Sequence, residues 1–388
     1  MKYFLFFLLF GLVACGRSGK GEGESLVCIQ GSRTSDSLQV ISLHSGLLQR
    51  KVPISEIIDT TSVEFVLLEM TDESLVGDLS TMGTVKVRDG KFYIKDEQQQ
   101  AIVVFSEKGK YLGKLNAMGR GPEEYHEILD FDVVRNEIAI LDYSRVLFYD
   151  AESFEFLRSK LLYDFMASRI LADSLYYYFH ASNTGAVKTS LIVCDTAMKI
   201  RTALMESGYE KYKRYGTVFF CIPTGQGMLY HQDRNDTLFR VTDSALVAAY
   251  AFDFGGKRFK DDYMGEQRKP RPTPEGYFSE IGEFCYADSV FTFYVNTSRP
   301  HPTFAGVYSL RSGVVRLFNT ADWVDDLYHL AVRWWGVPEG STPDGYFYTV
   351  IRPSFLSLEK PENLVGTPLE GYTLESNPVI VKFKFKEF

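Results

Sequence analysis

Six groups of strand-like sequence recur along the chain, and this recurrence limits the fold more than any other feature. Each group begins with a polar turn, continues with a segment rich in aromatic and β-branched residues, and repeats both after a second turn. Such residues fit pleated strands, and helical periodicity is scarce between the groups. The groups begin near residues 91, 136, 174, 227, 289 and 345.

A small twisted sheet cannot bury both of its faces alone, whereas sheets arranged radially around an axis bury one another. A four-stranded propeller blade takes about 40–50 residues, so the spacing fits six blades, some with insertions. We expect an inner strand before each group, such as ILDFDVV before Asn136. The prediction is therefore an all-β, six-bladed propeller. Two tandem β-sandwiches are the alternative, but they would not repeat one turn–strand–turn pattern six times.

The two ends of the chain are expected to share one blade. Residues 62–68 (SVEFVLL) precede the first group, and residues 377–385 (NPVIVKFKF) end in alternating apolar and basic residues. Pairing these two segments would close the ring and remove open sheet edges.

A short helical insertion is expected near residues 320–335. Apolar residues recur there at helical spacing, at Trp323, Leu327, Leu330, Ala331 and Trp334. An amphipathic stripe of this kind packs on a larger apolar surface. We expect this surface to be the propeller rather than a membrane.

The N-terminal residues have the features of an export signal. Lys2 precedes the apolar run YFLFFLLFGLV, which is shorter than the ~20 residues that span a bilayer. The run ends in LVACG, which resembles the lipobox of bacterial lipoproteins, in which the cysteine is acylated and becomes the first residue; an ordinary signal peptide is the alternative. We predict a signal peptide at 1–14, a lipidated Cys15 with a flexible tether at 15–36, and one propeller domain at 37–388.

Composition and motifs exclude several classes of function. The chain carries 42 Lys and Arg against 50 Asp and Glu, a net charge of −8, which argues against a nucleic-acid partner. No HExxH, GxSxG or Walker sequence is present, and we expect no cofactor or metal. Asp130-Phe131-Asp132 resembles only half of a calcium loop. Cys194 and Cys221 lie in apolar, strand-like runs and are expected to be buried thiols.

A family resemblance rests on the segment VFSEKGKYLGKLN and the GRGPEEY that follows it at residues 119–125. Both resemble the signature of the six-bladed β-propeller lipoproteins of Gram-negative gut and oral bacteria, in which FDxxGKF precedes GRGPGEY and an inner strand. Glu123 stands where that family usually has glycine. Residues 235–241 (NDTLFRV) and the NPVIVKFKF ending are also similar. The resemblance implies a propeller fold and export, and it brings no assigned reaction.

The loop from Gly119 to His126 has two interpretations. In the structural one, Gly119 and Gly121 adopt unusual φ angles and the loop joins two blades. In the functional one, the loop faces the channel mouth and binds a ligand through Arg120, Glu124, Tyr125 and His126.

Long insertions between consecutive groups suggest a binding rim. In a propeller, the crossovers from an outer strand to the next inner strand open on one face. Residues 209–215 and 255–277 each carry a net charge of +2 although the chain is acidic, and the insertions are rich in Tyr and Trp. Such a rim suits an anionic glycan, a peptide or an envelope protein. The predicted contacts are Tyr212, Arg214, Arg258 and Trp335, with solvated loops as the alternative.

Three functions are compatible with these features. The leading hypothesis is a non-catalytic binding or scaffold module, lipid-anchored in the cell envelope on the periplasmic side or at the cell surface. The second is a propeller-type hydrolase or lyase acting on saccharides or lactones, in which inner-strand ends bring together His126, His180, His231 and Asp233. The third is a structural subunit of an envelope complex.

Overall fold

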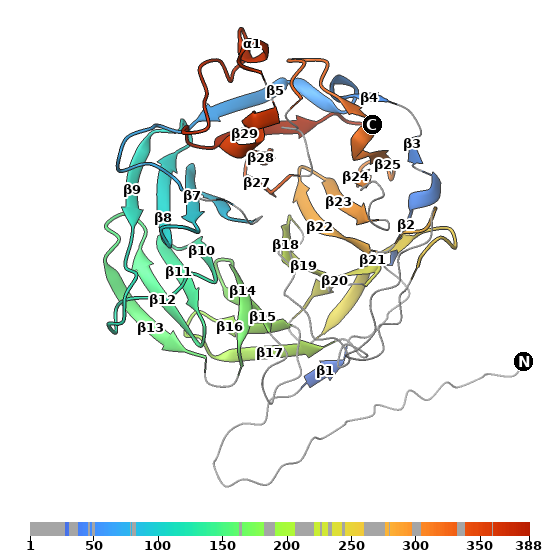
Figure 1. The fold of residues 1–388 in the computed structure, drawn as a ribbon. Coiled ribbons are helices and arrows are strands. Elements are labelled where there is room, and N and C mark those ends of the chain that lie inside the picture. Colours follow the sequence, from blue (N-terminus) through green and yellow to red (C-terminus); the bar gives the residue numbers. More distant parts are fainter. Residues whose placement is uncertain are drawn as a thin grey trace, which may run out of the picture.

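Six small antiparallel sheets stand around a common axis, as Figure 1 shows. This arrangement confirms the predicted all-β, six-bladed propeller. The computed structural model describes residues 28–30, 38–45, 47–48, 51–77, 79, 83–162, 165–181, 191–205, 221–225, 227–231, 235–242, 245–259, 276–278, 280–296, 304–331, 338–358 and 360–388.

Blades 1 and 2 each consist of four consecutive strands. Blade 1 comprises β6 (Val85–Arg88), β7 (Lys91–Asp96), β8 (Ala101–Ser106) and β9 (Tyr111–Leu115). Blade 2 comprises β10 (Asp130–Val134), β11 (Glu137–Asp142), β12 (Arg145–Asp150) and β13 (Phe156–Leu161). The first strand of each blade is innermost, so ILDFDVV contains the expected inner strand of blade 2.

Blades 3 to 5 follow the same order. Blade 3 comprises β14 (Ala167–Ala172), β15 (Tyr176–Ala181), β16 (Leu191–Asp195) and β17 (Ile200–Met205). Blade 4 comprises β18 (Cys221–Thr224), β19 (Gly227–His231), β20 (Thr237–Val241) and β21 (Leu246–Asp253). Blade 5 comprises β22 (Glu280–Ala287), β23 (Val290–Asn296), β24 (Phe304–Ser309) and β25 (Val315–Asn319).

The N-terminal part of the chain runs along the outer edges of these three blades, which the sequence did not predict. The strands β1 (Cys28–Gln30), β2 (Gln39–Ser42) and β3 (Leu47–Leu48) pair in parallel with β17, β21 and β25. Next, β4 (Val52–Pro53) pairs with β26 (Trp323–Val324). We call β1–β4 the N-terminal belt. Residues 28–30 lie in the predicted flexible tether, and at these positions the structure shows a strand instead.

Blade 6 closes the ring from both ends of the chain. It comprises β27 (Gly340–Ser341), β28 (Phe347–Ile351), β29 (Val379–Phe385) and β5 (Ile58–Leu67). The antiparallel register places Val379 opposite Leu67 and Phe385 opposite Ile58, with a bulge between Lys382 and Lys384. The predicted sharing of one blade is confirmed.

The insertion near residues 320–335 differs from the amphipathic helix that its spacing predicts. The helical element there is one 3-10 turn, η5 (Thr320–Asp322), and no helix follows within the described residues 323–331. The Asp325 carboxylate accepts hydrogen bonds from the backbone N–H groups of Leu327, Tyr328 and Leu330, and these bonds hold the segment in turns. Trp323 and Leu330 are nevertheless buried in the propeller core, as expected.

The remaining helical elements are short. They are η2 (Leu43–Ser45), η3 (Ile54–Glu56), η6 (Pro353–Leu358) and α1 (Pro361–Leu364). In the part of the chain that the structure describes, no helix has the length and apolar character needed to cross a bilayer.

The apolar core lies between neighbouring blades. Tyr93 and Ile102 of blade 1, for example, pack against Phe131 and Ile138 of blade 2. Three free cysteines, Cys194, Cys221 and Cys285, are buried in these layers, as expected for the first two. Burial raises the pKa of the Cys194 thiol to about 12, so it stays protonated at neutral pH.

Candidate binding site between blades 4 and 5

The loop at residues 119–126 forms part of the crossover from blade 1 to blade 2. The Tyr125 ring is fully buried and packs edge-to-face on Tyr149. Its hydroxyl donates to the Gln100 carbonyl (2.8 Å) and accepts from the Ala117 N–H (3.1 Å). Tyr125 therefore fastens the crossover to blade 1 and presents no surface to a ligand.

Space, and not backbone angle, accounts for the glycines of this loop. The Glu124 Oε2 atom accepts a hydrogen bond from the Gly121 N–H (2.7 Å), and a Cβ at Gly119 would lie 1.9 Å from that oxygen. Neither glycine has a positive φ, and neither does Glu123. The expected unusual φ angles are therefore wrong: a Cβ at Gly119 would instead displace the Glu124 carboxylate from its hydrogen bond to the Gly121 N–H.

Two other residues of the loop are exposed. Arg120 is exposed, and the His126 side chain is 55 % exposed, with Nδ1 3.5 Å from the buried Asp142 Oδ2. The same Asp142 oxygen accepts a hydrogen bond from Arg145 Nε (3.0 Å), and Arg145 also donates to the Glu124 carbonyl (2.6 Å). Arg120 and His126 thus remain accessible at the crossover face.

The predicted rim contacts are only partly within the described residues. Arg258 forms an ion pair with Asp236 (2.8 Å), and its side chain is only 11 % exposed. It is therefore bound within blade 4. The other predicted positions lie outside the described residues: Tyr212, Arg214, Trp335 and the predicted lipidation site Cys15.

The two central histidines of the enzyme hypothesis are buried. His180 lies in β15 and His231 in β19, and burial lowers the pKa of each to about 4. His231 Nε2 lies 3.0 Å from the Asn235 carbonyl oxygen, and the ring packs on Phe284. Both histidines belong to the blade interiors, and Asp233 lies outside the described residues.

The alternating aspartates of β10 join two inner strands. Asp130 accepts a hydrogen bond from the Ile170 N–H (2.9 Å), and Asp132 accepts one from the Ala172 N–H (2.8 Å). Asp132 also pairs with Arg88 (3.1 Å). These carboxylates link blade 2 to its neighbours. Within the described ranges, no group of three or more His, Cys, Asp or Glu could hold a metal ion.

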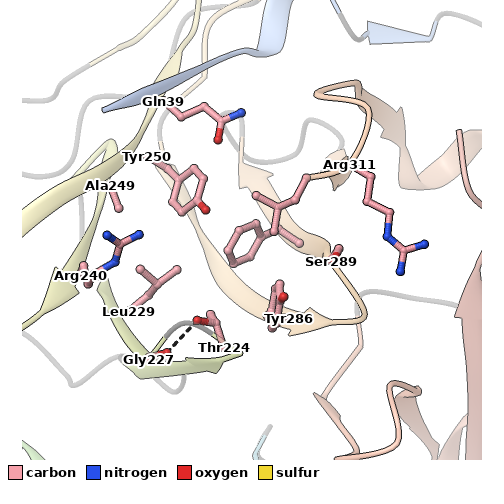
Figure 2. Close-up of a pocket in the computed structure, with 12 residues that line it drawn as sticks. Gln39, Thr224, Gly227, Leu229, Arg240, Ala249, Tyr250, Tyr286, Ser289 and Arg311 are labelled. Atoms are coloured by element: carbon pink, nitrogen blue, oxygen red, sulfur yellow. Dashed lines mark hydrogen bonds between the residues drawn. The ribbon is translucent and has the colours of Figure 1, made fainter. Parts of the chain in front are cut away.

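A cavity of about 420 Å³ lies between blades 4 and 5 (Figure 2). Arg240 and Tyr250 line it from blade 4, Tyr286 and Ser289 line it from blade 5, and Gln39 reaches it from the belt strand β2. Its lining includes the β18–β19, β22–β23 and β24–β25 turns. In antiparallel blades these turns lie on the face opposite the crossovers. The cavity is therefore on the opposite face from the predicted rim.

Aromatic side chains form one wall of the cavity. Phe291 packs on Tyr250 and on Tyr286, with ring centroids 5.2 and 5.0 Å apart. Gln39 pairs in register with Tyr250, and its side-chain amide donates to the Tyr308 hydroxyl. Burial raises the pKa of Tyr250 although nearby Arg240 lowers it, so its hydroxyl is a neutral donor at pH 7.

The two arginines of the cavity differ in their ionic partners. The described residues that line it include two arginines and no Asp or Glu. Arg311 at the margin is compensated by Asp288 (3.0 Å) and by Glu387. The lining offers Arg240 no such carboxylate. Among the described residues its guanidinium has no carboxylate partner and can receive an anionic group within a partly aromatic cavity.

The family follows from a comparison over nearly the whole propeller. Residues 38–384 match the model of a domain of unknown function, DUF4934. The chain belongs to the DUF4934 family. The description of that family assigns no activity, and no curated protein matches the chain.

Two solved structures of other proteins are similar to this chain. A Bacteroides fragilis protein described as exported is similar at a TM-score of 0.66 and 18 % identity, over 90 % of this chain and 100 % of that chain. A DUF4221 member from Bacteroides vulgatus has a TM-score of 0.45 at 11 % identity, over 84 % of this chain and 99 % of that one. The first similarity supports the propeller fold of this DUF4934 member.

Sequence reasoning missed the cavity residues Gln39, Arg240, Tyr250 and Tyr286. Arg240 lies within the NDTLFRV segment, which was noted only for its resemblance. Arginines and tyrosines that alternate along strands are typical of any solvated sheet face. Only the packing of β2, blade 4 and blade 5 brings these four residues together, and no local pattern marks them.

Proposed function

We propose that the protein is a non-catalytic binding module of the cell envelope, exported and held at a membrane by a lipid on Cys15. Its ligand binds in the cavity between blades 4 and 5. The candidate ligands are a glycan, a peptide or a segment of an envelope protein. The observation that carries the proposal is a cavity lined by two tyrosines and by Arg240, for which the described lining supplies no carboxylate.

The size and lining of the cavity support this proposal. Small-molecule sites typically have volumes of ~300–1,000 Å³ and combine aromatic walls with a few polar groups. The cavity of about 420 Å³ falls within this range, and Tyr250 and Tyr286 supply its accessible aromatic surface, since Phe291 is only 1 % exposed. Tyrosine and arginine are also the side chains that contribute most to binding energy in protein interfaces.

The inner strands give less support to the hydrolase or lyase alternative. Asp130 and Asp132 are bonded to backbone groups of the next blade, and Glu339 pairs with Arg352 (2.8 Å). His180 and His231 are enclosed within their blades and neutral. The three carboxylates are therefore engaged in structural contacts.

A bulky residue at the edge of the cavity tests the proposal. The purified protein is applied to arrays of acidic and neutral oligosaccharides and of peptides. We expect Thr224→Trp, which places an indole at the cavity, to weaken the binding found for the wild type about tenfold or more. Thr196→Trp is the matched control, because Thr196 is an exposed turn residue of blade 3.

The control is expected to bind like the wild type. Equal weakening by the two tryptophan variants would mean that the cavity is not the binding site. Conversion of a bound saccharide into a product would favour the enzyme alternative instead.

A further inference from the structure

We propose that the cavity between blades 4 and 5 recognises a saccharide that carries a carboxylate, a uronic-acid residue, and that the Arg240 guanidinium binds this carboxylate. The inference rests on the proposed function, because it assumes that the cavity is a binding site. Four features of the cavity lead to it: charge, aromatic surface, neutral polar groups, and the closure of its sheet edges.

Among the described cavity residues, the single arginine without an ionic partner favours a ligand with one anionic group. The part of the cavity lining that the structure describes offers Arg240 no Asp or Glu, whereas Arg311 is paired with Asp288 and Glu387. In Figure 2 the Arg311 side chain points away from Tyr250 and the other labelled groups. One planar guanidinium matches one carboxylate in a bidentate pair. A phosphate dianion would be better served by several cations or by a nest of backbone N–H groups.

The aromatic side chains of the cavity favour a ligand that contains a ring. Tyr250 and Tyr286 each pack on Phe291, with ring centroids 5.2 and 5.0 Å apart, and because Phe291 is only 1 % exposed the two tyrosines present the accessible aromatic surface. Tyrosine combines an apolar ring face with a polar hydroxyl at its end. A pyranose has the same mixed character, with C–H groups on its faces and hydroxyls at its edge. The wall can therefore contact a sugar face while the tyrosine hydroxyls meet the sugar hydroxyls.

Neutral polar groups in the cavity suit a ligand with many hydroxyls. The side-chain amide nitrogen of Gln39 donates a hydrogen bond to the Tyr308 hydroxyl. Its amide oxygen can therefore accept a hydrogen bond from a ligand. Ser289 adds a hydroxyl at the β22–β23 turn, whereas the Thr224 hydroxyl already donates to the Gly227 carbonyl (2.8 Å). Such groups both donate and accept, as sugar hydroxyls do. A simple aliphatic acid would leave most of them without a ligand partner.

The closed sheet edges argue against an extended peptide. A peptide commonly binds a sheet by adding a strand to an open edge. The outer edge of blade 4 is already paired with β2, and that of blade 5 with β3. Side chains rather than free backbone groups are therefore what this cavity offers to a ligand.

Calorimetric titration of the full chain in detergent tests the inference. The probes are galacturonic acid and glucuronic acid, the neutral sugars galactose and glucose, and acetate. We expect the two acids to bind about tenfold or more tightly than the neutral sugars, because a charge-assisted hydrogen bond is lost with the carboxylate. Acetate should not compete at equal concentration, since it lacks the ring.

Two arginine variants form a matched pair. Arg240→Gln should weaken uronate binding about tenfold or more and leave binding of the neutral sugars unchanged. Arg201→Gln is the control: Arg201 lies in β17 of blade 3, away from the cavity, and is paired with Asp195 (2.8 Å), so this variant should leave uronate affinity within about twofold.

Other results would overturn the uronate assignment. Equal affinity for acidic and neutral sugars, equal effects of the two arginine variants, or the absence of binding by any of these sugars would each do so. The binding-module proposal is judged separately, by the Thr224→Trp and Thr196→Trp pair on the arrays. A ligand that binds there and is displaced by Thr224→Trp would keep that proposal while excluding the uronate.

Discussion

His180 and His231 are polar residues enclosed in apolar layers of blades 3 and 4. Both residues are almost completely buried, with exposed fractions of 3 % for His180 and 1 % for His231. Burial disfavours the charged imidazolium and lowers the pKa of each from 6.5 to about 4, and Arg169 acts in the same direction on His180. Each histidine is therefore neutral in the folded protein at pH 7.

These two histidines make the stability of the fold depend on pH. Their pKa is lower in the folded than in the unfolded state, so the unfolded state binds more protons between pH 6.5 and 4. The stability that the neutral histidines contribute is fully present above pH 6.5 and is lost as the pH falls towards 4. We expect the free energy of unfolding, measured by urea titration, to fall by up to ~3 kcal/mol per histidine over this window.

A variant isolates this effect from other titrating groups. His231→Phe retains a ring against Phe284 and should reduce the pH dependence of stability between 6.5 and 4. Burial raises the pKa of the Glu339 carboxyl, so this group makes stability rise as the pH falls. The effect is the same in the wild type and in the variant, and it cancels when the two are compared. His44→Phe is the control, since His44 is half exposed. An unchanged slope in His231→Phe would contradict the assignment.

Short outer strands are the least expected elements of this structure. The belt strands β1, β2 and β3 have only three, four and two residues, yet they pair with the outer strands of three blades. Edge strands otherwise expose unpaired backbone groups that recruit other chains. The belt also contributes Gln39 to the cavity, so the chain between the predicted anchor and the propeller forms part of the proposed site.

Adjacent residues of β2 provide a test of the belt. Ile41 is 2 % exposed and packs in the apolar layer between blades 4 and 5, whereas Val40 is 60 % exposed. Ile41→Ala should lower the free energy of unfolding by about 2–5 kcal/mol, because it removes buried methyl groups and leaves a void. Val40→Ala should change it by less than about 0.5 kcal/mol. Urea unfolding measures both, and equal small effects would mean that the belt is not packed in solution.

At the scale of the whole molecule, pairing between strands from the two ends of the chain closes the ring. Strand β29 from the C-terminus lies between β28 and β5, so blade 6 needs both ends of the chain. Lys382 of β29 adds an ion pair with Glu64 of β5 (3.1 Å). The described propeller is thus one closed unit with the belt on its outside, and the proposed lipid would attach upstream of that belt.

The proposed anchor is tested on the whole protein. Cys15→Ala should move the protein from the membrane fraction to the soluble fraction and abolish labelling by a radioactive fatty acid, because the acyl chains are attached to that residue. Cys28→Ala is the control and should remain labelled and membrane-bound. Fatty-acid labelling of Cys15→Ala at the wild-type level would contradict the assignment.

The sequence alone determined the blades, because strand alternation and turn residues are local patterns. The groups beginning near 91, 136 and 174 contain the second strands of blades 1 to 3, and the shared blade followed from two end segments that needed partners. Burial of Cys194 was likewise evident from its apolar neighbours. In each case, a few consecutive residues carry the information.

The N-terminal belt, the turns after residue 322 and the cavity could be recognised only in the tertiary structure. A strand of two to four residues is too short to show a period, and the helical spacing at 323–334 could not reveal that Asp325 would bind three backbone N–H groups. Gln39, Arg240 and Tyr286 meet only because β2 lies along blade 4 and blade 5 packs beside it. Contacts between residues so distant along the chain depend on how the sheets pack, which local sequence does not encode.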